Sequence, residues 1–155
     1  MERPELIEKV RTMSKNMWVL GPLHGVQHWD RVYANGMMLC KKIENANAMV
    51  VGLFAYLHDC CRNNDGNDNQ HGFYASRFIS MIRDTVLKEV PDEDIILLKK
   101  ACELHTVTLQ TGDPTIDVCF DADRLDLTRC GVVPDPFRMA TAYGANLARK
   151  MQRNN

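Results

Sequence analysis

The residues best suited to chemistry in this chain are its histidines, and each of the five stands beside other polar or charged groups. His24 and His28 are four residues apart near the start of an expected helix, so both side chains can lie on one helix face. A third histidine belongs to the pair His58-Asp59, which closes the longest apolar run of the chain, residues 48–57. An imidazole and a carboxylate at the end of a buried helix cost free energy unless they are paired or bind a metal ion.

A second acidic group follows in the segment Asp121-Ala122-Asp123-Arg124-Leu125-Asp126, and His71 and His105 lie between the two groups. Nitrogen and oxygen donors together suit a catalytic divalent cation better than a closed structural zinc site. The residue types therefore indicate metal-assisted chemistry, provided that the fold brings these segments together.

The elements that must position these residues are expected to be helical. Apolar residues recur at helical spacing, and no run alternates with a period of two for long enough to predict a sheet. We expect an all-α bundle of about six or seven helices, over residues 5–15, 26–43, 48–60, 71–89, 92–106, 114–127 and 136–151. A buried strand is the alternative for 48–60, because that run is short and almost wholly apolar. Asp113-Pro114 and Asp135-Pro136 each resemble an N-cap followed by proline at the first helical position.

Length and composition favour one soluble domain, residues 1–155. The formal charge of −1 provides no global basic excess, so we expect neither nucleic acid nor a membrane as a partner. Six cysteines contain no C-x-x-C pair, and the first residues carry charge and a proline rather than the apolar stretch of an export signal. We therefore expect thiols in a reducing cytoplasm, and the oligomeric state is left open.

Taken in order, these motifs resemble the HD-domain metal-dependent phosphohydrolases. The matching segments are His28-Trp29-Asp30-Arg31-Val32, His58-Asp59 and Ala122-Asp123-Arg124-Leu125-Asp126. The chain is also similar to a small bacterial branch of HD-domain proteins, on the segments His24-Gly25, Asn64-Asp65-Gly66, His71-Gly72, Ala101-Cys102, His105-Thr106 and Asp121 to Leu127. The resemblance covers about residues 24–128 and implies an all-α HD-domain bundle with a central metal site.

Position by position, the resemblance implies four primary metal ligands: His28, His58, Asp59 and Asp123. His71 and His105 match less closely two histidines that some HD proteins add to hold a second metal ion. Alternatively, these two side chains donate hydrogen bonds to a substrate phosphate. The implied ion is divalent, with Mn, Mg, Ni, Fe and Zn as candidates, and one or two ions remain open.

The resemblance also suggests substrate contacts. Arg62 stands where many relatives carry Lys or Arg shortly after the His-Asp pair, which suits a phosphate contact. His24 and Arg31 are further candidates, with a surface residue and a structural ion-pair partner as the respective alternatives. Asp59 could take a proton from metal-bound water in addition to being a ligand, because the glutamate that some relatives use for this step is missing here. Other candidates for the base are Asp126 and Asp65.

The implied function is metal-dependent hydrolysis of a small phosphorylated molecule, a nucleotide among the candidates, as a phosphomonoesterase or phosphodiesterase. An HD-fold di-iron oxygenase is one alternative, because the chain supplies the required order of His, His-Asp, His, His and Asp. The short interval from Asp59 to His71 leaves the closure of such a site open. A third hypothesis is a module that senses a nucleotide through this site without turning it over.

Overall fold

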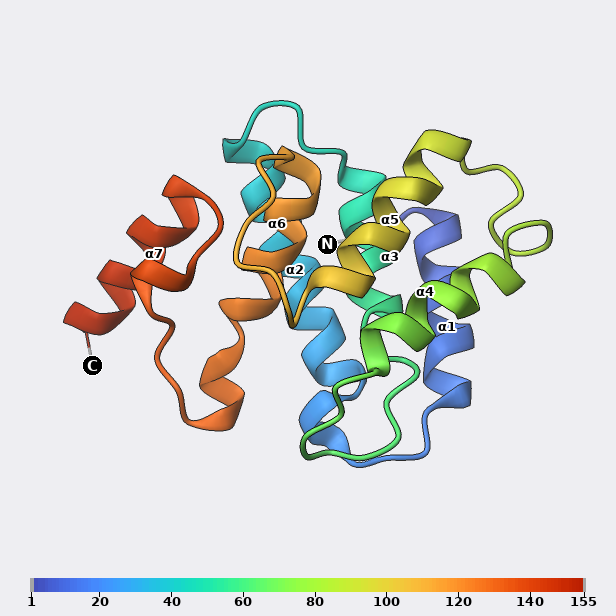
Figure 1. The fold of residues 1–155 in the computed structure, drawn as a ribbon, viewed down its shortest axis with the longest axis horizontal. Helices are drawn as coiled ribbons and strands as arrows, with labels where there is room; N and C mark the ends of the chain where they lie inside the picture. Colours follow the sequence, from blue (N-terminus) through green and yellow to red (C-terminus); the bar gives the residue numbers. More distant parts are fainter. Residues whose placement is uncertain (1, 155) are drawn as a thin grey trace.

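The computed structural model describes residues 2–154, and these form seven α-helices, three 3-10 helices and no strand (Figure 1). The elements are α1 (Glu5–Met17), η1 (Pro22–His24), α2 (Val26–Lys42), α3 (Ala48–Leu57), α4 (His71–Met81), α5 (Asp92–Leu104), α6 (Pro114–Arg124), η2 (Leu127–Cys130), η3 (Pro136–Arg138) and α7 (Ala142–Arg153). The all-α prediction is confirmed, and the alternative of a buried strand over 48–60 is wrong.

Helix α3 is the centre of the bundle, and α1, α2, α5 and α6 all contact it. Every residue from Val50 to Leu57 is fully buried, as expected for a helix that is apolar on all sides. Its first turn is capped by Asn47, whose side-chain oxygen accepts hydrogen bonds from the backbone N–H groups of Met49 and Val50 at 3.1 and 3.2 Å. Because α3 is so deeply buried, it also fixes the position of the residues that directly follow its last turn.

Three predicted helix ends are wrong. The helix expected over 48–60 ends at Leu57. The helix expected over 71–89 ends at Met81 and continues as turns, because Arg83 donates to the Leu87 carbonyl (2.8 Å) and the Leu87 N–H bonds Ile82. This arrangement buries Leu87 completely. The helix expected over 114–127 ends at Arg124 and is followed by η2.

The helix expected over 136–151 is divided in two. Asp135 caps only the three-residue η3 through the Phe137 N–H, the chain is extended at Met139, and α7 begins at Ala142. The interruption has a clear cause, since Asp121 in α6 accepts hydrogen bonds from the backbone N–H groups of Ala140 (2.7 Å) and Thr141 (2.8 Å). The cap predicted at Asp113 is confirmed by its bonds to the next helical turn.

The six cysteines are free thiols. Within residues 2–154, no helix has both the length and the apolar character that crossing a membrane requires.

Replacing Asn47 with alanine should lower the free energy of unfolding by about 1 kcal/mol, because the first turn of α3 loses its cap. Urea denaturation measures this change. Asn16→Ala is the matched control, since Asn16 is exposed in the last turn of α1 and caps no helix start. An equal loss in both variants would contradict the capping role.

Candidate metal centre

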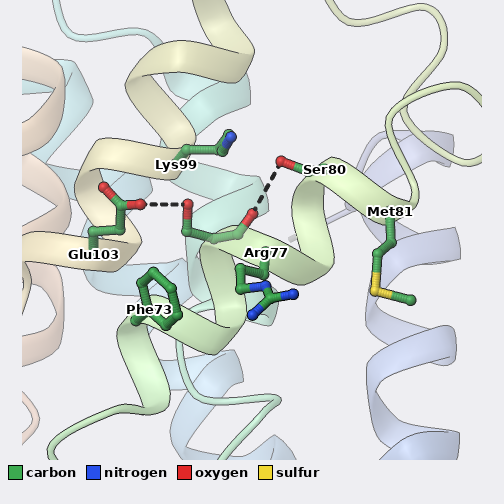
Figure 2. Close-up of a pocket in the computed structure, with 7 residues that line it drawn as sticks. Phe73, Arg77, Ser80, Met81, Lys99 and Glu103 are labelled. Carbon is green, nitrogen blue, oxygen red and sulfur yellow. Dashed lines mark hydrogen bonds between the residues drawn. The ribbon is translucent and has the colours of Figure 1, made fainter.

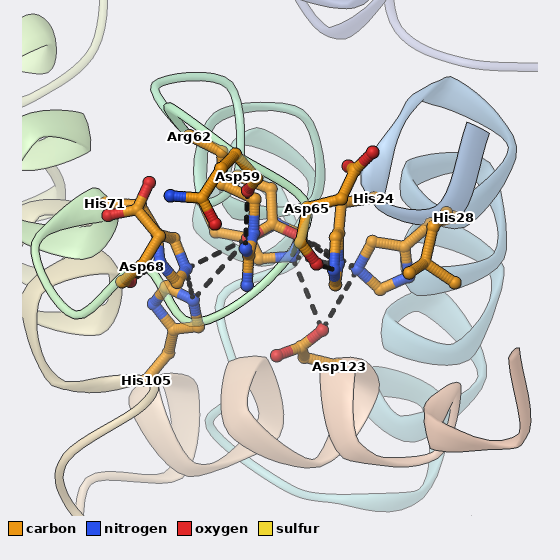
Figure 3. Close-up of polar contacts among 12 residues, drawn as sticks. His24, His28, Asp59, Arg62, Asp65, Asp68, His71, His105 and Asp123 are labelled. Atoms are coloured by element: carbon orange, nitrogen blue, oxygen red, sulfur yellow. Dashed lines mark hydrogen bonds and ion pairs between the residues drawn. The ribbon is translucent and has the colours of Figure 1, made fainter. Parts of the chain in front are cut away.

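The ends and turns of five helices bring the predicted ligands to one place (Figure 3). His28 lies in the first turn of α2, His58 and Asp59 follow α3 directly, His71 is the first residue of α4, His105 follows α5, and Asp123 stands near the end of α6. Except for Asp123, whose side chain retains 18% exposure, these side chains are almost completely buried. Burying so many imidazole and carboxylate groups together requires that they pair or bind a cation.

The Asp59 carboxylate lies at the middle of the cluster and turns one oxygen toward each of two histidine pairs. Its Oδ2 is 3.2 Å from Nε2 of His28 and 3.3 Å from Nε2 of His58. Its Oδ1 is 3.0 Å from Nε2 of His71 and 3.8 Å from Nε2 of His105. The cluster therefore contains two groups of candidate ligands that share Asp59.

All four imidazoles donate from Nδ1, and this fixes which nitrogen is left to bind a cation. Nδ1 of His28 lies 2.7 Å from the Asp126 carboxylate, and Nδ1 of His58 lies 3.0 Å from the Phe54 carbonyl. Nδ1 of His71 and of His105 each lies 2.6 Å from a backbone carbonyl, those of Asp68 and Cys102. These oxygens only accept hydrogen bonds, so in a neutral ring the free lone pair is on Nε2.

The Nε2 atoms face each other within each pair, at 3.2 Å for His28 and His58 and at 2.9 Å for His71 and His105. Two lone pairs at such distances repel unless a proton or a metal ion lies between them. Ligands about 2.0–2.2 Å from one cation stand about 2.9–3.5 Å apart in tetrahedral or octahedral geometry. Most separations in the cluster fall in this range, and the distance of His105 from Asp59 is the exception.

Asp123 completes the first group. Its Oδ1 lies 3.1 Å from Nε2 of His28 and 3.4 Å from Nε2 of His58, yet this buried atom has no hydrogen-bond partner among the described residues. An oxygen that is close to two imidazoles but bonded to neither has the position of a ligand to a shared cation. The buried cluster around Asp59 could therefore bind a metal ion, and its donor set of imidazoles and carboxylates fits a divalent one.

The pKa values of the buried histidines and aspartates in the cluster depend strongly on one another's charge. Burial alone lowers the pKa of His28, but the carboxylates of Asp123, Asp126 and Asp59 outweigh it and raise the pKa to about 10. The pKa of His58 rises to about 9 in the same way, because Asp59 and Asp123 outweigh burial. Burial favours the neutral form of these two aspartates, yet the charge of His58 and contacts with neighbouring histidines hold both carboxyl pKa values well below their usual range.

His24 lies beside the cluster but uses both ring nitrogens elsewhere. Its Nε2 donates to the Asp65 carbonyl (3.1 Å), and Nδ1 accepts from Arg129 (3.3 Å). Nδ1 is 4.0 Å from Oδ2 of Asp59. Burial, followed by the charge of Arg62, lowers the pKa of His24. These contacts place His24 as a support for the loop after Asp59, next to the candidate ligands.

The two arginines expected at the substrate also make internal contacts. Arg62 donates from Nε to Oδ1 of Asp59 (3.3 Å) and from Nη1 to the carbonyls of Asn64 and Gly66, which shapes the loop over the site. Arg31 donates to Oδ1 of Asp126 at 2.7 Å, the contact expected of a structural ion-pair partner. Both guanidinium groups thus place positive charge near the carboxylates of the cluster.

From the sequence Asp126 is expected only as a base, whereas in the structure its carboxylate bonds Nδ1 of His28. One oxygen of the Asp126 carboxylate accepts a hydrogen bond from Nδ1–H of His28, and the other accepts one from Nε–H of Arg31. The spacing contained a signal for this, because Asp126 follows Asp123 by three residues, which in the helix expected over 114–127 places both on one face. The carbonyls of Asp68 and Cys102 could not be predicted in this way, because every residue has a backbone carbonyl and its residue type gives no signal.

The groove of largest volume described on this surface, about 600 Å³, lies elsewhere, between α4 and α5 (Figure 2). Phe73, Arg77, Met81 and Lys99 are among the side chains that line it, and Ser76 donates to Glu103 at 2.8 Å within it. No residue of the Asp59 cluster is part of its lining. Size alone therefore does not indicate where the chemistry of this chain takes place.

Replacing Asp126 with asparagine should weaken metal binding about 10- to 100-fold, because His28 loses the charged acceptor that orients it. Titration with Mn²⁺ followed by calorimetry measures the change. Asp84→Asn, at an exposed position, is the control. Equal affinity in the Asp126 variant and the wild type would contradict the orienting role.

Metal affinity should rise with pH. The folded metal-free protein keeps His28 and His58 protonated at neutral pH, because their pKa values of about 10 and about 9 lie above the ordinary 6.5. The metal must displace these protons, so affinity should increase by up to about tenfold per pH unit for each proton released. Conversely, the stability that these protons give the metal-free protein is complete below pH 6.5 and is lost as pH rises through 9 to 10. Calorimetry in buffers of different ionisation enthalpy counts the protons, and none released at pH 7 would contradict this reading.

Comparison with known proteins gives no relative from which a role for this cluster could be transferred: no family model, no curated protein and no solved structure matches the chain.

Proposed function

We propose that this chain is an HD-domain phosphohydrolase that uses a divalent metal centre to hydrolyse a small phosphorylated molecule. The observation that carries the proposal is the shared Asp59 carboxylate, which faces two histidine pairs whose Nε2 atoms converge. The order of His28, His58-Asp59 and Asp123 along the chain, which resembles that superfamily, supports it independently.

In this proposal His28, His58, Asp59 and Asp123 hold one ion, and His71 and His105 hold a second one together with Asp59. A bound divalent ion lowers the pKa of a water ligand and offsets charge on the phosphoryl group. The protein orients the ligands: Asp126 aligns His28, and backbone carbonyls align the other three rings. Asp59 stays ionised at neutral pH, which suits its role as a ligand.

Positive charge around the cluster favours a phosphorylated substrate over an uncharged one. Arg62 and Arg31 contact Asp59 and Asp126, and Arg129 donates to the carbonyl of Asp126 and to His24. Most of these donors are already used inside the protein, but their charges still raise the local potential for an approaching anion. This concentration of arginines in a chain of net charge −1 supports hydrolysis of phosphate esters.

The test combines metal analysis with turnover of a panel of phosphomonoesters and phosphodiesters. The wild type should bind two ions per chain and hydrolyse at least one ester, and Asp59→Ala should abolish both properties. His105→Ala should retain one ion, because His28, His58 and Asp123 remain. His24→Ala should keep both ions, since its nitrogens bond Asp65 and Arg129.

Asp84→Ala is the control for Asp59→Ala. Full metal occupancy without turnover of any ester would contradict the hydrolase. The same six residues could hold two irons, so oxygen consumption by protein that contains two irons without added metal would favour the oxygenase. Saturable nucleotide binding without product would favour the sensing module.

A further inference from the structure

A groove lies between the turn Thr106–Leu109 after α5 and the segment Leu127–Arg138 after α6, and the candidate ligand His105 contributes to its lining. One cavity of about 310 Å³ in this groove includes His105 in its lining. A second cavity of about 300 Å³ shares three lining residues with the first and continues along Val132 to Met139; the shared residues are Arg124, Leu127 and Arg138. We call the two together the His105 groove.

The two walls of the His105 groove are joined by one side chain. Arg124, the residue after Asp123, donates from Nη1 to the carbonyls of Leu109 (2.7 Å) and Arg138 (3.0 Å). Its Nη2 donates to the Thr108 carbonyl at 2.7 Å. The same guanidinium lies over the Phe120 ring, 5.0 Å from the ring centre. The two walls are therefore tied together by Arg124, which follows the candidate ligand Asp123 in the chain.

The lining of the groove combines apolar surface with one exposed, weakly paired cation, Arg138. Leu109 and Val132 remain 50% and 49% exposed, although residues of this type are normally buried. The Arg138 side chain is 82% exposed, and its one ion pair among the described residues is with Asp135 at 3.9 Å. An exposed pair at this distance is weak, so the guanidinium can bind another anion. Arg124 cannot replace it, since three carbonyls already occupy its donors.

We infer that the His105 groove binds the organic part of the substrate, and that the substrate is a phosphate ester with an apolar or aromatic body and a second anionic group. This inference rests on the proposed function, in which the phosphoryl group lies at the metal centre. The apolar body would then lie against Leu109, and Arg138 would contact the second anion. Cavities of about 300 Å³ suit molecules of this size.

The test titrates three phosphonates, which cannot be hydrolysed, into the Mn²⁺-loaded wild type by calorimetry. Methylphosphonate carries only the anion, benzylphosphonate adds a ring, and 4-carboxybenzylphosphonate adds a second anion. The ring should strengthen binding about tenfold by burying apolar surface. The carboxylate should add roughly three- to fivefold, the effect of one exposed ion pair.

Arg138→Ala should remove the gain from the carboxylate and keep the gain from the ring. Leu109→Ser should reduce the gain from the ring and keep that from the carboxylate. The matched controls are Arg153→Ala and Ile96→Ser, at exposed positions on α7 and α5 that do not line the groove. Both controls should bind all three phosphonates as the wild type does.

Equal affinity for the three phosphonates, or a carboxylate gain that survives in Arg138→Ala, would overturn the groove inference and leave ester hydrolysis unaffected. If none of the three binds, the groove inference also fails, and the ester panel decides the proposed function separately. Graded binding by a protein that hydrolyses no ester would support the groove and contradict the hydrolase.

Discussion

The candidate site depends on one interaction: the Asp59 carboxylate is shared between two pairs of histidines. The carboxylate can lie there because α3, buried along nearly its whole length, ends two residues before it. Helices α2, α4 and α5 then each need only bring one histidine to meet it. The central helix thus has two roles, because the apolar residues that stabilise the bundle also fix the position of its most polar residue.

A single short segment, Asp121 to Asp126, connects this site to the rest of the molecule. Asp121 holds the start of α7 through the Ala140 and Thr141 amides, and Asp123 faces the first histidine pair. Arg124 ties together the two walls of the His105 groove, and Asp126 orients His28. Since these residues lie within two helical turns, a shift of α6 would change the metal centre, the groove and the C-terminal helix together.

The sequence allowed the helical class and the grouping of candidate ligands to be predicted, because periodic apolar positions and the spacing of His and Asp are local signals. It did not allow the C-terminal end of α4 or the start of α7 to be predicted. Those boundaries depend on hydrogen bonds of Arg83 with Leu87 and of Asp121 with Thr141, which form only when the chain has folded. The carbonyls that orient His71 and His105 could not be predicted either, because any residue has a backbone carbonyl that could supply the bond.

The raised pKa values of His28 and His58 have a consequence for how the protein matures. At neutral pH, protons on these rings neutralise the buried carboxylates before any metal arrives, so the chain can complete its folding without a cofactor. In the proposed metal centre, metal binding would then exchange these protons for a metal ion in a chain that is already folded, and folding would not depend on the metal.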